Sequence, residues 1–394
     1  MKREAVIVSA VRTPVGRFRG GLAYATHHSL AALVMKGALA KSKLNPAEID
    51  EIFYGNLTGV WYNNIARYAA LEAGIPVCVP ATTIDKQCGT SITEAGFAAA
   101  MIEAGQMDTV LIGGVNQDTR RAWLFEKPDQ PFPLAPPKPY PPTSTSPASF
   151  GEPNMLVTAE NLAKKYNISR EECDAFALES HKKAANATNL GYFADTTVTV
   201  EIDLGRGKTS VVAQDETVRA DSSLEALAKL PVVSGVEGGV CTAGNSSPFS
   251  DGASAVVIME KGKAIQIGAP VLGYVRGYAA VGVEPHIMGI GPAPAVKKLL
   301  SKVGMKLEDI DLFEINEAFA AQTLACIKEL KLDTAKLNVN GGAIALGHPL
   351  AATGGILIAK MVSELARRNA RYGVIAFCCG GGQGVAMLIE SGVK

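Results

Sequence analysis

Two stretches that lie far apart in the chain share one pattern: SKLNPAEIDEIFYGN at residues 42–56 and VGMKLEDIDLFEINE at residues 303–317. Each begins as a short polar helix start, continues through an Ile-Asp pair, and then runs as an apolar strand to an Asn. A short apolar run bounded by polar residues predicts a buried strand. Self-similarity of this kind indicates an internal duplication, so we expect two halves with the same order of elements.

The sequence that follows each stretch supports the duplication. Each half continues with a predicted strand, a turn with a reactive residue, a helix of small residues, and a strand ending in glycines. In the first half these segments are TTIDKQCG (82–89), TSITEAGFAAAMIEAG (90–105) and TVLIGG (109–114). In the second half they are KLNVNGG (336–342), HPLAATGGILIAKMVSELARR (348–368) and GVIAFCCGGG (373–382). The opening strands, AVIVSAVRT (5–13) and APVLGYVRGYA (269–279), also correspond.

The order of these segments predicts an α/β fold. Strands that alternate with helices at this spacing imply mixed, largely parallel sheets covered by helices. Two similar halves imply two such layers, packed through the small-residue helices as a shared central layer.

The composition narrows the class of protein. At 394 residues the chain is too long for one simple core, and its 38 Lys+Arg equal its 38 Asp+Glu, so no net charge directs it to nucleic acid. The seven cysteines are odd in number and scattered, which argues against a disulfide framework and for a reducing compartment. No signal peptide, transit peptide or membrane span is evident. We therefore expect a cytoplasmic protein without a membrane partner and without a metal site.

A different region separates the two halves. Residues 119–155, here called the arm, hold ten prolines between Pro128 and Pro153, together with several aromatic residues. Proline removes backbone donors and fixes φ, so the arm is predicted to be an extended loop that serves as a binding cover or an assembly element. A helical segment is expected from Thr158 to about Asn189, followed by polar strands. The predicted division is residues 1–118, completed by about 241–268; an inserted loop domain, 119–240; and a second half, 269–394.

Cys88 and His348 occupy corresponding turns of the two halves. Cys88 in DKQCGTS precedes a predicted helix, where the positive end of the helix dipole favours a nucleophilic thiolate. His348 in GGAIALGHPLAATGG lies in a glycine-rich turn before another helix, with Pro349 suited to its first position. A buried structural cysteine and a turn histidine bonded to backbone are the simpler interpretations. A Cys–His pair formed across the interface between the halves is the functional one.

The stretch AFCCGGGQG (376–384) places two cysteines before a glycine run. VAMLIES follows as a predicted strand, so the glycines join two strands, and no phosphate-binding motif or spaced metal-ligand cluster is present. Cys378 and Cys379 are neighbours on a strand, so their side chains face opposite ways and one of them can face a site. Strand periodicity alone does not say which.

Two further segments carry polar groups. Asn316 in FEINEAFA either holds a water or a carbonyl oxygen, or simply caps the helix that follows. The loop CTAGNSSPFSDGAS (241–254) is either a ligand-contacting loop or a tight connection.

Taken together, these segments resemble the thiolase family, the acetyl-CoA acetyltransferases and 3-ketoacyl-CoA thiolases, over nearly the whole chain. The matching motifs are IVSAVRTPVGRFRG (7–20), the CG turn at Cys88, TAEN (158–161), DETVR (215–219), TAGNSS with DGA (242–253), MGIGPAPA (288–295), NEAF (316–319), GGAIALGHP (341–349) and C-x-GGG-x-G (378–384). The resemblance implies a five-layer α/β/α/β/α sandwich of two duplicated βαβαβαββ halves, with a loop domain inserted in the first half.

The resemblance also implies a role for each catalytic residue. Cys88 would take the acyl group as a thioester, and His348 would activate it. Cys378 would be the second acid/base, so Cys379 would only pack in the core. Asn316 would position a water that forms one oxyanion hole with His348, and the N–H groups of Cys88 and Gly380 would form the other, as two developing negative charges require.

Coenzyme A would enter as a co-substrate, with no permanently bound cofactor. Seven residues match family positions in contact with it: Ser247, Ala243, Met155, Met288, Ala318, Phe319 and Arg219. The sequence departs from the family around the nucleophile, in LAAT (350–353) where a Gly-Ala-Ser pattern is usual, and above all in the arm. These departures concern the acyl pocket and assembly rather than the catalytic positions.

The resemblance predicts an acyl-CoA C-acyltransferase that acts on 3-oxoacyl-CoA by reversible thiolysis and Claisen condensation, and that forms a homodimer or a tetramer. One alternative is a thiolase specialised for a bulky, branched or aromatic 3-oxoacyl-CoA, because the arm is unusual and rich in aromatic residues. A decarboxylating condensing enzyme is disfavoured, since such enzymes pair Cys with His-His or His-Asn. A non-catalytic CoA-binding scaffold ranks low, and the sequence gives no sign of an auxiliary protein subunit that completes the pocket.

Overall fold

The computed structural model describes residues 3–59, 62–128, 130, 136–139, 145–151 and 154–393. Much of the arm, including Phe132, Tyr140 and Pro153, lies outside these residues. Within its described part, Trp123 and Phe125 are exposed and Phe125 forms an isolated antiparallel bridge with Pro139. No helix in the described ranges is long and apolar enough to cross a membrane.

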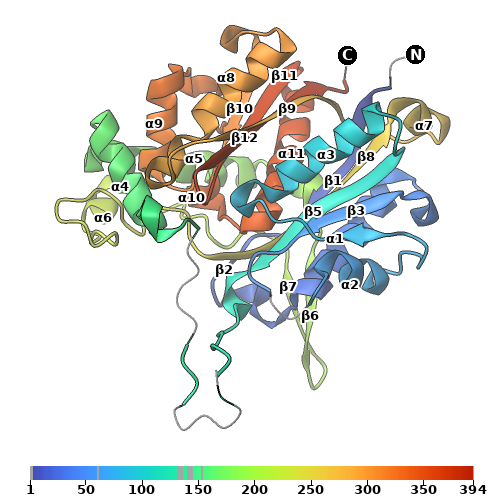
Figure 1. Ribbon diagram of the computed structural model, residues 1–394, viewed down its shortest axis with the longest axis horizontal. Helices are drawn as coiled ribbons and strands as arrows, with labels where there is room; N and C mark the ends of the chain where they lie inside the picture. The colour runs from blue at the N-terminus through green and yellow to red at the C-terminus, as the bar shows by residue number, and fades with distance from the viewer. Residues whose placement is uncertain are drawn as a thin grey trace.

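The elements fall into two similar sets, and a third set interrupts the first in chain order (Figure 1). The first set comprises β1 (Ala5–Arg12), β2 (Gly16–Arg17), α1 (His27–Ser42), β3 (Glu51–Gly55), α2 (Ile65–Glu72), β4 (Ala81–Thr82), α3 (Thr90–Glu103), β5 (Thr109–Gln117), β8 (Ser250–Glu260) and α7 (Lys261–Gln266). The second set comprises β9 (Gly273–Gly282), α8 (Pro292–Val303), β10 (Leu312–Ile315), α9 (Ala320–Leu330), α10 (Ala343–Leu346), α11 (Leu350–Arg368), β11 (Tyr372–Cys379) and β12 (Gln383–Ser391). The intervening set comprises α4 (Met155–Tyr166), α5 (Arg170–Asn189), β6 (Val200–Gly205), β7 (Lys208–Val212) and α6 (Leu224–Ala228).

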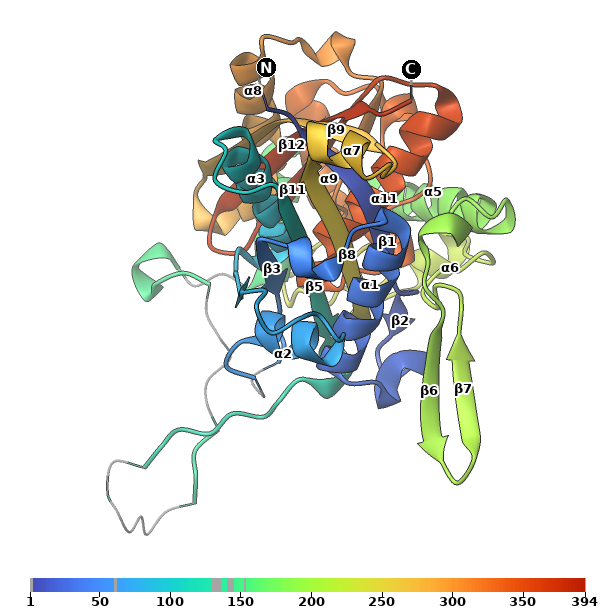
Figure 2. The same ribbon diagram turned by 90° about the vertical axis from the view of Figure 1, so that its right-hand side faces the viewer.

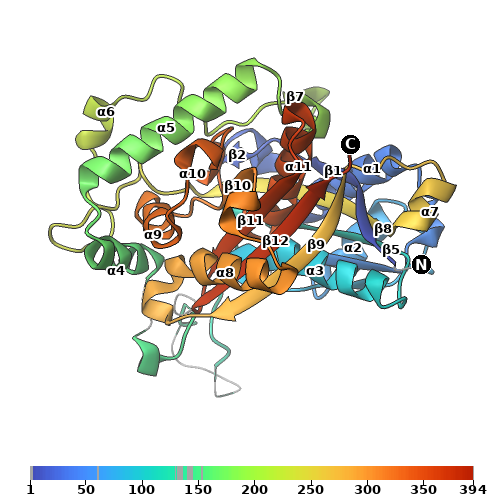
Figure 3. The same ribbon diagram turned by 90° about the horizontal axis from the view of Figure 1, so that it is seen from above.

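Apart from the separate β6–β7 pair, the described strands form one continuous path, in the order β10-β11-β12-β9-β1-β8-β5-β3-β4, with β2 paired to β8. Between the described strands, the two sets pair only through β1 and β9, where Val6 faces Tyr274 and Ile7 faces Gly273. The helices α3 and α11 contact each other and contact strands of both sets, so they form a central layer. On the outer faces α1 and α2 cover the first set of strands and α8 covers the second (Figure 3). This arrangement is the predicted five-layer sandwich.

The prediction of largely parallel sheets is wrong. Among the described strands only the pairs β3–β4, β3–β5 and β10–β11 are parallel. The strands β8 and β12 pair antiparallel with both of their neighbours. A connection as short as Gly380–Gly382 between β11 and β12 permits only an antiparallel return, because parallel neighbours need a crossover of a dozen or more residues.

The strand predicted at 336–342 is also absent, apart from one bridge between Phe313 and Leu337. Asn338 there adopts a left-handed φ of 44°. Its side-chain amide takes the place of a strand partner, accepting from the N–H of Ile315 and donating to the Ile315 carbonyl. This segment therefore closes the β10 edge through a side chain.

The helix predicted from Thr158 to Asn189 is two helices. Asn167 ends α4 in a left-handed conformation, and Ser169 begins α5 with a capping box whose N3 residue is Glu172. The predicted polar strands are present as the β6–β7 hairpin, which projects from the body in Figure 2.

Candidate active site

A short 3₁₀ turn, Gln87–Gly89, carries Cys88 to the start of α3. Asp85 accepts the N–H of Gln87 at 2.7 Å, while Thr90 accepts the N–H of Lys86 and donates to the Gln87 carbonyl. Gln87 is held at a φ of 52°, which is uncommon for a non-glycine residue. The turn contacts both α11 and β11, so Cys88 lies where the two halves meet.

Cys378 and Cys379, at the end of β11, face opposite sides as predicted. Cys378 belongs to a small apolar cluster with Met288 and Ala318, against which Met155 and Phe319 pack. Cys379 faces the central layer instead, where a Cβ added to Gly89 would lie 2.6 Å from its Sγ. The structure thus places Cys378 among four of the residues matched to coenzyme A contacts.

His348 lies in the turn between α10 and α11, and Asn316 follows β10. The N–H of Asn316 donates to the Ala376 carbonyl of β11 at 3.0 Å, which joins the two strand ends. The Asn316 Nδ2 lies 3.3 Å from Nε2 of His348, and Nδ1 of His348 lies 2.7 Å from Oγ1 of Thr353. Asn316 is not a helix cap, since α9 begins only at Ala320 with Phe319 as its N-cap.

The glycine turn after Cys378 lies next to Cys88. The N–H of Gly380 donates a hydrogen bond to the Cys88 thiol sulfur, so the two turns meet at this point. A described part of the arm also reaches here: a Cβ added to Gly381, whose φ is 82°, would lie 2.7 Å from the Thr145 carbonyl oxygen. Only glycine is accommodated at Gly381, and no sequence pattern pointed to this contact with Thr145.

Burial controls the protonation of the site. It raises the pKa of Cys88 to about 12, although hydrogen bonds from the N–H groups of Cys88 and Gly380 act in the opposite direction and Asp85 adds to the rise. It also raises the pKa of Cys378 well above its usual range, with Cys88 and Cys379 as further contributors. Burial lowers the pKa of His348 to about 4. The resting site therefore holds neutral thiols and a neutral imidazole. At Cys88 the effect of burial on the pKa outweighs the effect of the helix start, which was expected to favour thiolate.

Two buried ionic networks support the loops that carry Asn316 and His348. The carboxylate of Glu317 accepts from Ser180, Asn338 and the N–H of Ile344. The Lys360 Nζ on α11 lies 2.9 Å from Glu314 and 2.7 Å from the Gly341 carbonyl. Sequence reasoning missed both networks, although a lone Lys in the apolar stretch ILIAKMV of the helix was a usable signal.

The loop 241–254 packs against the segment that follows Asn316. The N–H of Ser247 donates to the Ala318 carbonyl at 3.0 Å, and Ser246 forms an isolated bridge with Phe319. Asn245 organises the loop by accepting from the N–H of Thr242. Ser247 is thereby held beside the Cys378 cluster, whereas Ala243 is exposed. Arg219 lies outside that cluster, and its backbone N–H donates to Nδ1 of His181.

Two thiols, an imidazole and an amide at the junction of duplicated α/β halves are the kinds of group that acyl transfer through a cysteine requires. Family comparisons agree. The chain matches the model "Thiolase, N-terminal domain" over residues 5–262 and the model "Thiolase, C-terminal domain" over residues 269–391. It therefore belongs to the thiolase family, as its motifs indicated.

Individual relatives cover almost the whole chain. It is 40% identical to a beta-ketoadipyl-CoA thiolase of Acinetobacter baylyi and 41% identical to an acetyl-CoA acetyltransferase of Chromobacterium violaceum, in each case over 98% of this chain and 99% of the relative. Among solved structures, human mitochondrial 3-ketoacyl-CoA thiolase superposes with a TM-score of 0.93 at 38% identity, covering 99% of both chains. The acetyl-CoA acetyltransferase of Bacillus anthracis superposes with a TM-score of 0.92 at 39% identity, again covering 99% of both chains. The chain is thus an acyltransferase with the thiolase fold, and coenzyme A is a substrate of that family rather than a resident cofactor.

Proposed function

We propose that this thiolase cleaves and forms 3-oxoacyl-CoA through an acyl-Cys88 intermediate. The observation that carries the proposal is the meeting of the Cys88 turn with the Cys378 strand end, where the N–H of Gly380 bonds the Cys88 sulfur. In this proposal Cys88 is the nucleophile, His348 is its base, and Cys378 is the second acid/base. The two thiols have separate tasks, because thiolysis needs one group to hold the acyl chain and another to handle the proton at carbon.

The proton steps follow from the neutral resting site. In the cleavage direction, the Cys88 proton passes to His348 as sulfur attacks the 3-oxo carbon. The bond between C2 and C3 then breaks, and the departing acetyl-CoA carbanion takes its proton from Cys378. The resulting Cys378 thiolate removes the proton from incoming CoA, whose sulfur attacks the acyl-Cys88 carbonyl. Cys88 leaves as thiolate and recovers its proton from His348.

Two groups of donors would stabilise the negative charge that develops. The N–H groups of Cys88 and Gly380 are proposed to bind the oxygen of the tetrahedral intermediate at Cys88. Asn316 is proposed to hold a water that, with His348, faces the enolate oxygen of the leaving acetyl-CoA. Supporting this role, Oδ1 of Asn316 is buried without a hydrogen-bond partner among the described residues. Preorganised donors of this kind contribute roughly 3–4 kcal/mol each to lowering the barrier.

The binding of coenzyme A is proposed along the Cys378 cluster. Met155, Met288, Ala318 and Phe319 supply its apolar wall, and Ser247 and Ala243 belong to the adjoining loop. Arg219 is proposed at the nucleotide end. The proposed substrate class is 3-oxoacyl-CoA without a particular acyl chain, because the names of the relatives contain different acyl groups. No observation on the described residues favours a bulky or aromatic substrate, or a scaffold without catalysis.

Organisation, assembly and location complete the proposal. In this proposal the chain divides into a first half (residues 1–118 with 241–268), an inserted loop domain (119–240) and a second half (269–394). The pairing of β8 supports this division, because β8 lies between β1 and β5 of the first half. A homodimer or tetramer is supported by the exposed apolar side chains of Phe97 and Met101 on α3 and of Trp123 in the arm. A cytoplasmic location is supported by the odd number and the spacing of the cysteines.

The nucleophile is tested with Cys88→Ser. Rapid-quench labelling with acetoacetyl-CoA is expected to give a stable acyl adduct on the wild type and none on the variant. Cys241→Ser serves as the matched control, since this buried thiol lies in another cluster and its loss is expected to preserve labelling. An acyl adduct that still forms on Cys88→Ser would show that the nucleophile is a different residue.

A further inference from the structure

The imidazole of His348 is held by one side chain on each ring nitrogen. Nε2 contacts the amide of Asn316 and Nδ1 contacts the hydroxyl of Thr353, and all three side chains are buried. The backbone N–H of His348 is fixed separately, by Oγ of Ser250 at 3.2 Å. Because the ring is neutral in the resting site, its one proton resides on one nitrogen or the other, and these two contacts decide which.

The donors and acceptors permit two arrangements. An amide Nδ2 can only donate, so the contact with Asn316 makes Nε2 an acceptor and leaves the proton on Nδ1, where the Thr353 oxygen accepts it. Turning the Asn316 amide over would reverse both hydrogen bonds and place the proton on Nε2. Thr353 contacts Nδ1 in both arrangements, so Nε2 is the nitrogen that can act as the base. Only the first arrangement leaves Nε2 with a lone pair.

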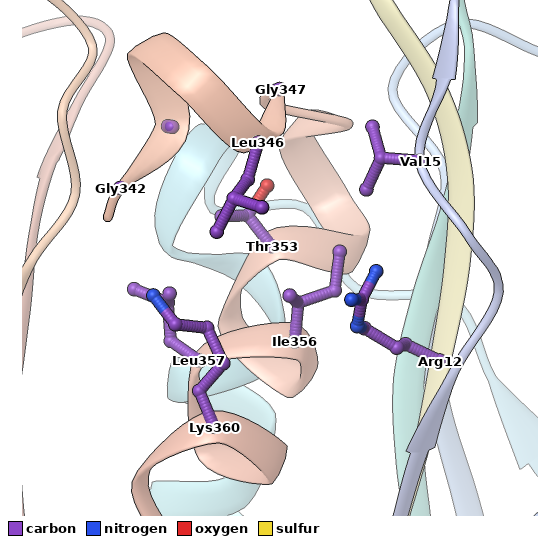
Figure 4. A pocket seen from close by; sticks show the side chains of 10 residues that line it. Arg12, Val15, Gly342, Leu346, Gly347, Thr353, Ile356, Leu357 and Lys360 are labelled. Atoms are coloured by element: carbon purple, nitrogen blue, oxygen red, sulfur yellow. The ribbon is translucent and has the colours of Figure 1, made fainter. Parts of the chain in front are cut away.

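Thr353 is well suited to hold its hydroxyl in one place. It lies in the first turn of α11, beneath the Gly347 turn that precedes His348, and Figure 4 shows its oxygen directed toward that turn. The start of α11 is anchored from outside, by the Ser91 hydroxyl on the Ala351 carbonyl and by the Ser254 hydroxyl on the Ala352 carbonyl. A β-branched side chain in a helix also has few χ1 rotamers.

The cationic groups nearest to Thr353 are engaged elsewhere. Thr353 lines a cavity of about 10 Å³ together with Arg12 and Lys360 (Figure 4). Arg12 binds Asp215 through both terminal nitrogens, and Lys360 binds Glu314 and the Gly341 carbonyl. Among the described residues the Thr353 hydroxyl hydrogen-bonds to His348 and to neither of these cations.

We propose that Thr353 is a positioning residue that fixes the tautomer of His348, its hydroxyl accepting the Nδ1 proton so that Nε2 keeps the lone pair that accepts from Asn316 at rest and takes the proton of Cys88 in the reaction. The inference rests on the proposed thiolase function, in which His348 is the base. Among the described residues the Thr353 hydroxyl bonds His348 and neither thiol, so it acts through the imidazole. The neutral hydroxyl performs the orienting task that a carboxylate performs for the catalytic histidine of serine proteases.

The tautomer is read directly by NMR on the resting enzyme. The five histidines are labelled with ¹⁵N, and the His348 signals are assigned by their loss in His348→Asn. Two-bond coupling patterns distinguish a proton on Nδ1 from one on Nε2. We expect the Nδ1–H form in the wild type and in Thr353→Ser, and a mixture or the Nε2–H form in Thr353→Val. A proton on Nε2 in the wild type overturns the proposal.

Steady-state kinetics with acetoacetyl-CoA and CoA supply the second readout. Thr353→Val keeps the volume and the branching of the side chain but loses the oxygen. We therefore expect kcat to fall about 10²-fold, with KM changed less than about threefold. This fall in kcat is smaller than the ~10⁴-fold loss observed when a catalytic histidine is held in the wrong tautomer. Thr353→Ser retains the hydroxyl and should stay within about threefold of the wild type. Equal losses in both variants, or an unchanged kcat in Thr353→Val, contradict the proposal. If Thr353→Val unfolds at assay temperature, Thr353→Ala replaces it.

These results are separable from those that test the function. A wild-type enzyme that forms no acyl-Cys88 refutes the thiolase proposal, whereas the NMR tautomer is measured without any substrate. Conversely, a normal acyl-enzyme with Nε2 protonated at rest refutes only the role of Thr353.

Discussion

The adjacent residues Cys378 and Cys379 offer the sharpest test of the site, because they differ only in the side of β11 that they face. Cys378 lies in the apolar cluster with Met288 and Ala318, and Cys379 lies in the central layer against Gly89. We predict that Cys378→Ala removes most of the thiolase activity and that Cys379→Ala affects mainly stability. One alanine substitution at each position gives a matched pair.

The magnitudes follow from the environment of each thiol. Removing a general acid/base costs about 10²–10⁴-fold in rate, or roughly 3–5 kcal/mol of barrier, and we expect Cys378→Ala in this range. Cys379 is a fully buried sulfur that receives a hydrogen bond from the N–H of Gly89. Its loss removes that hydrogen bond and leaves a small cavity, while the N–H of Gly89 still donates to the Lys86 carbonyl, so the change should cost about 1 kcal/mol of unfolding free energy. Since that N–H belongs to the Cys88 turn, a fall in kcat of about threefold is expected as well.

Two assays separate the roles. Thiolysis of acetoacetyl-CoA requires protonation of a carbanion and should fail in Cys378→Ala. Exchange of labelled CoA into acetyl-CoA involves no carbanion and uses Cys378 only to move the proton of the CoA thiol, so it should fall much less than thiolysis in Cys378→Ala and disappear in Cys88→Ser. Thermal unfolding reports the cost of Cys379→Ala. Comparable losses of thiolysis in the two alanine variants, or a loss of exchange in Cys378→Ala as large as its loss of thiolysis, would refute the assignment of Cys378.

Two further predictions concern buried charge. Lys360→Met should lower the unfolding free energy by roughly 3–5 kcal/mol, because it leaves Glu314 buried without its cation. The double variant with Glu314→Leu should recover part of the loss. Equal melting temperatures of Lys360→Met and wild type would contradict the argument. Glu94 is wholly buried, with one carboxylate oxygen bonded to the N–H of Gly113 and the other unpaired among the described residues, and burial raises its pKa well above the usual range. The folded protein therefore retains a proton that the unfolded chain releases above its ordinary pKa near ~4.3, so stability falls as pH rises between the two values. Glu94→Gln should remove this slope, so its melting temperature relative to the wild type should be higher at pH 8 than at pH 5; a pH-independent difference would count against it.

The sequence predicted more of the site than of the sheet. Motif order and duplication predicted Cys88, His348, Asn316 and Cys378 as site residues, and strand alternation correctly placed the two cysteines on opposite faces. The direction of the strands was wrong, because an apolar run looks the same in a parallel and an antiparallel neighbour. The segment at 336–342 was predicted as a strand because Val339 and its neighbours suit one, but the side chain of Asn338 occupies the strand edge instead.

The sequence by itself determined the family and predicted the two halves and the candidate reactive groups, because these follow from local periodicity and from residue types at set spacings. Only the tertiary structure decided how those groups are protonated and held. Burial, which depends on every element packed around the site, raises the pKa of Cys88 and lowers that of His348. The contacts between α3, α11 and β11 join residues hundreds of positions apart, as when the Gly380 N–H meets the Cys88 sulfur. Periodicity within one segment carries no information on such a partner, because a hydrogen bond is set by position in space.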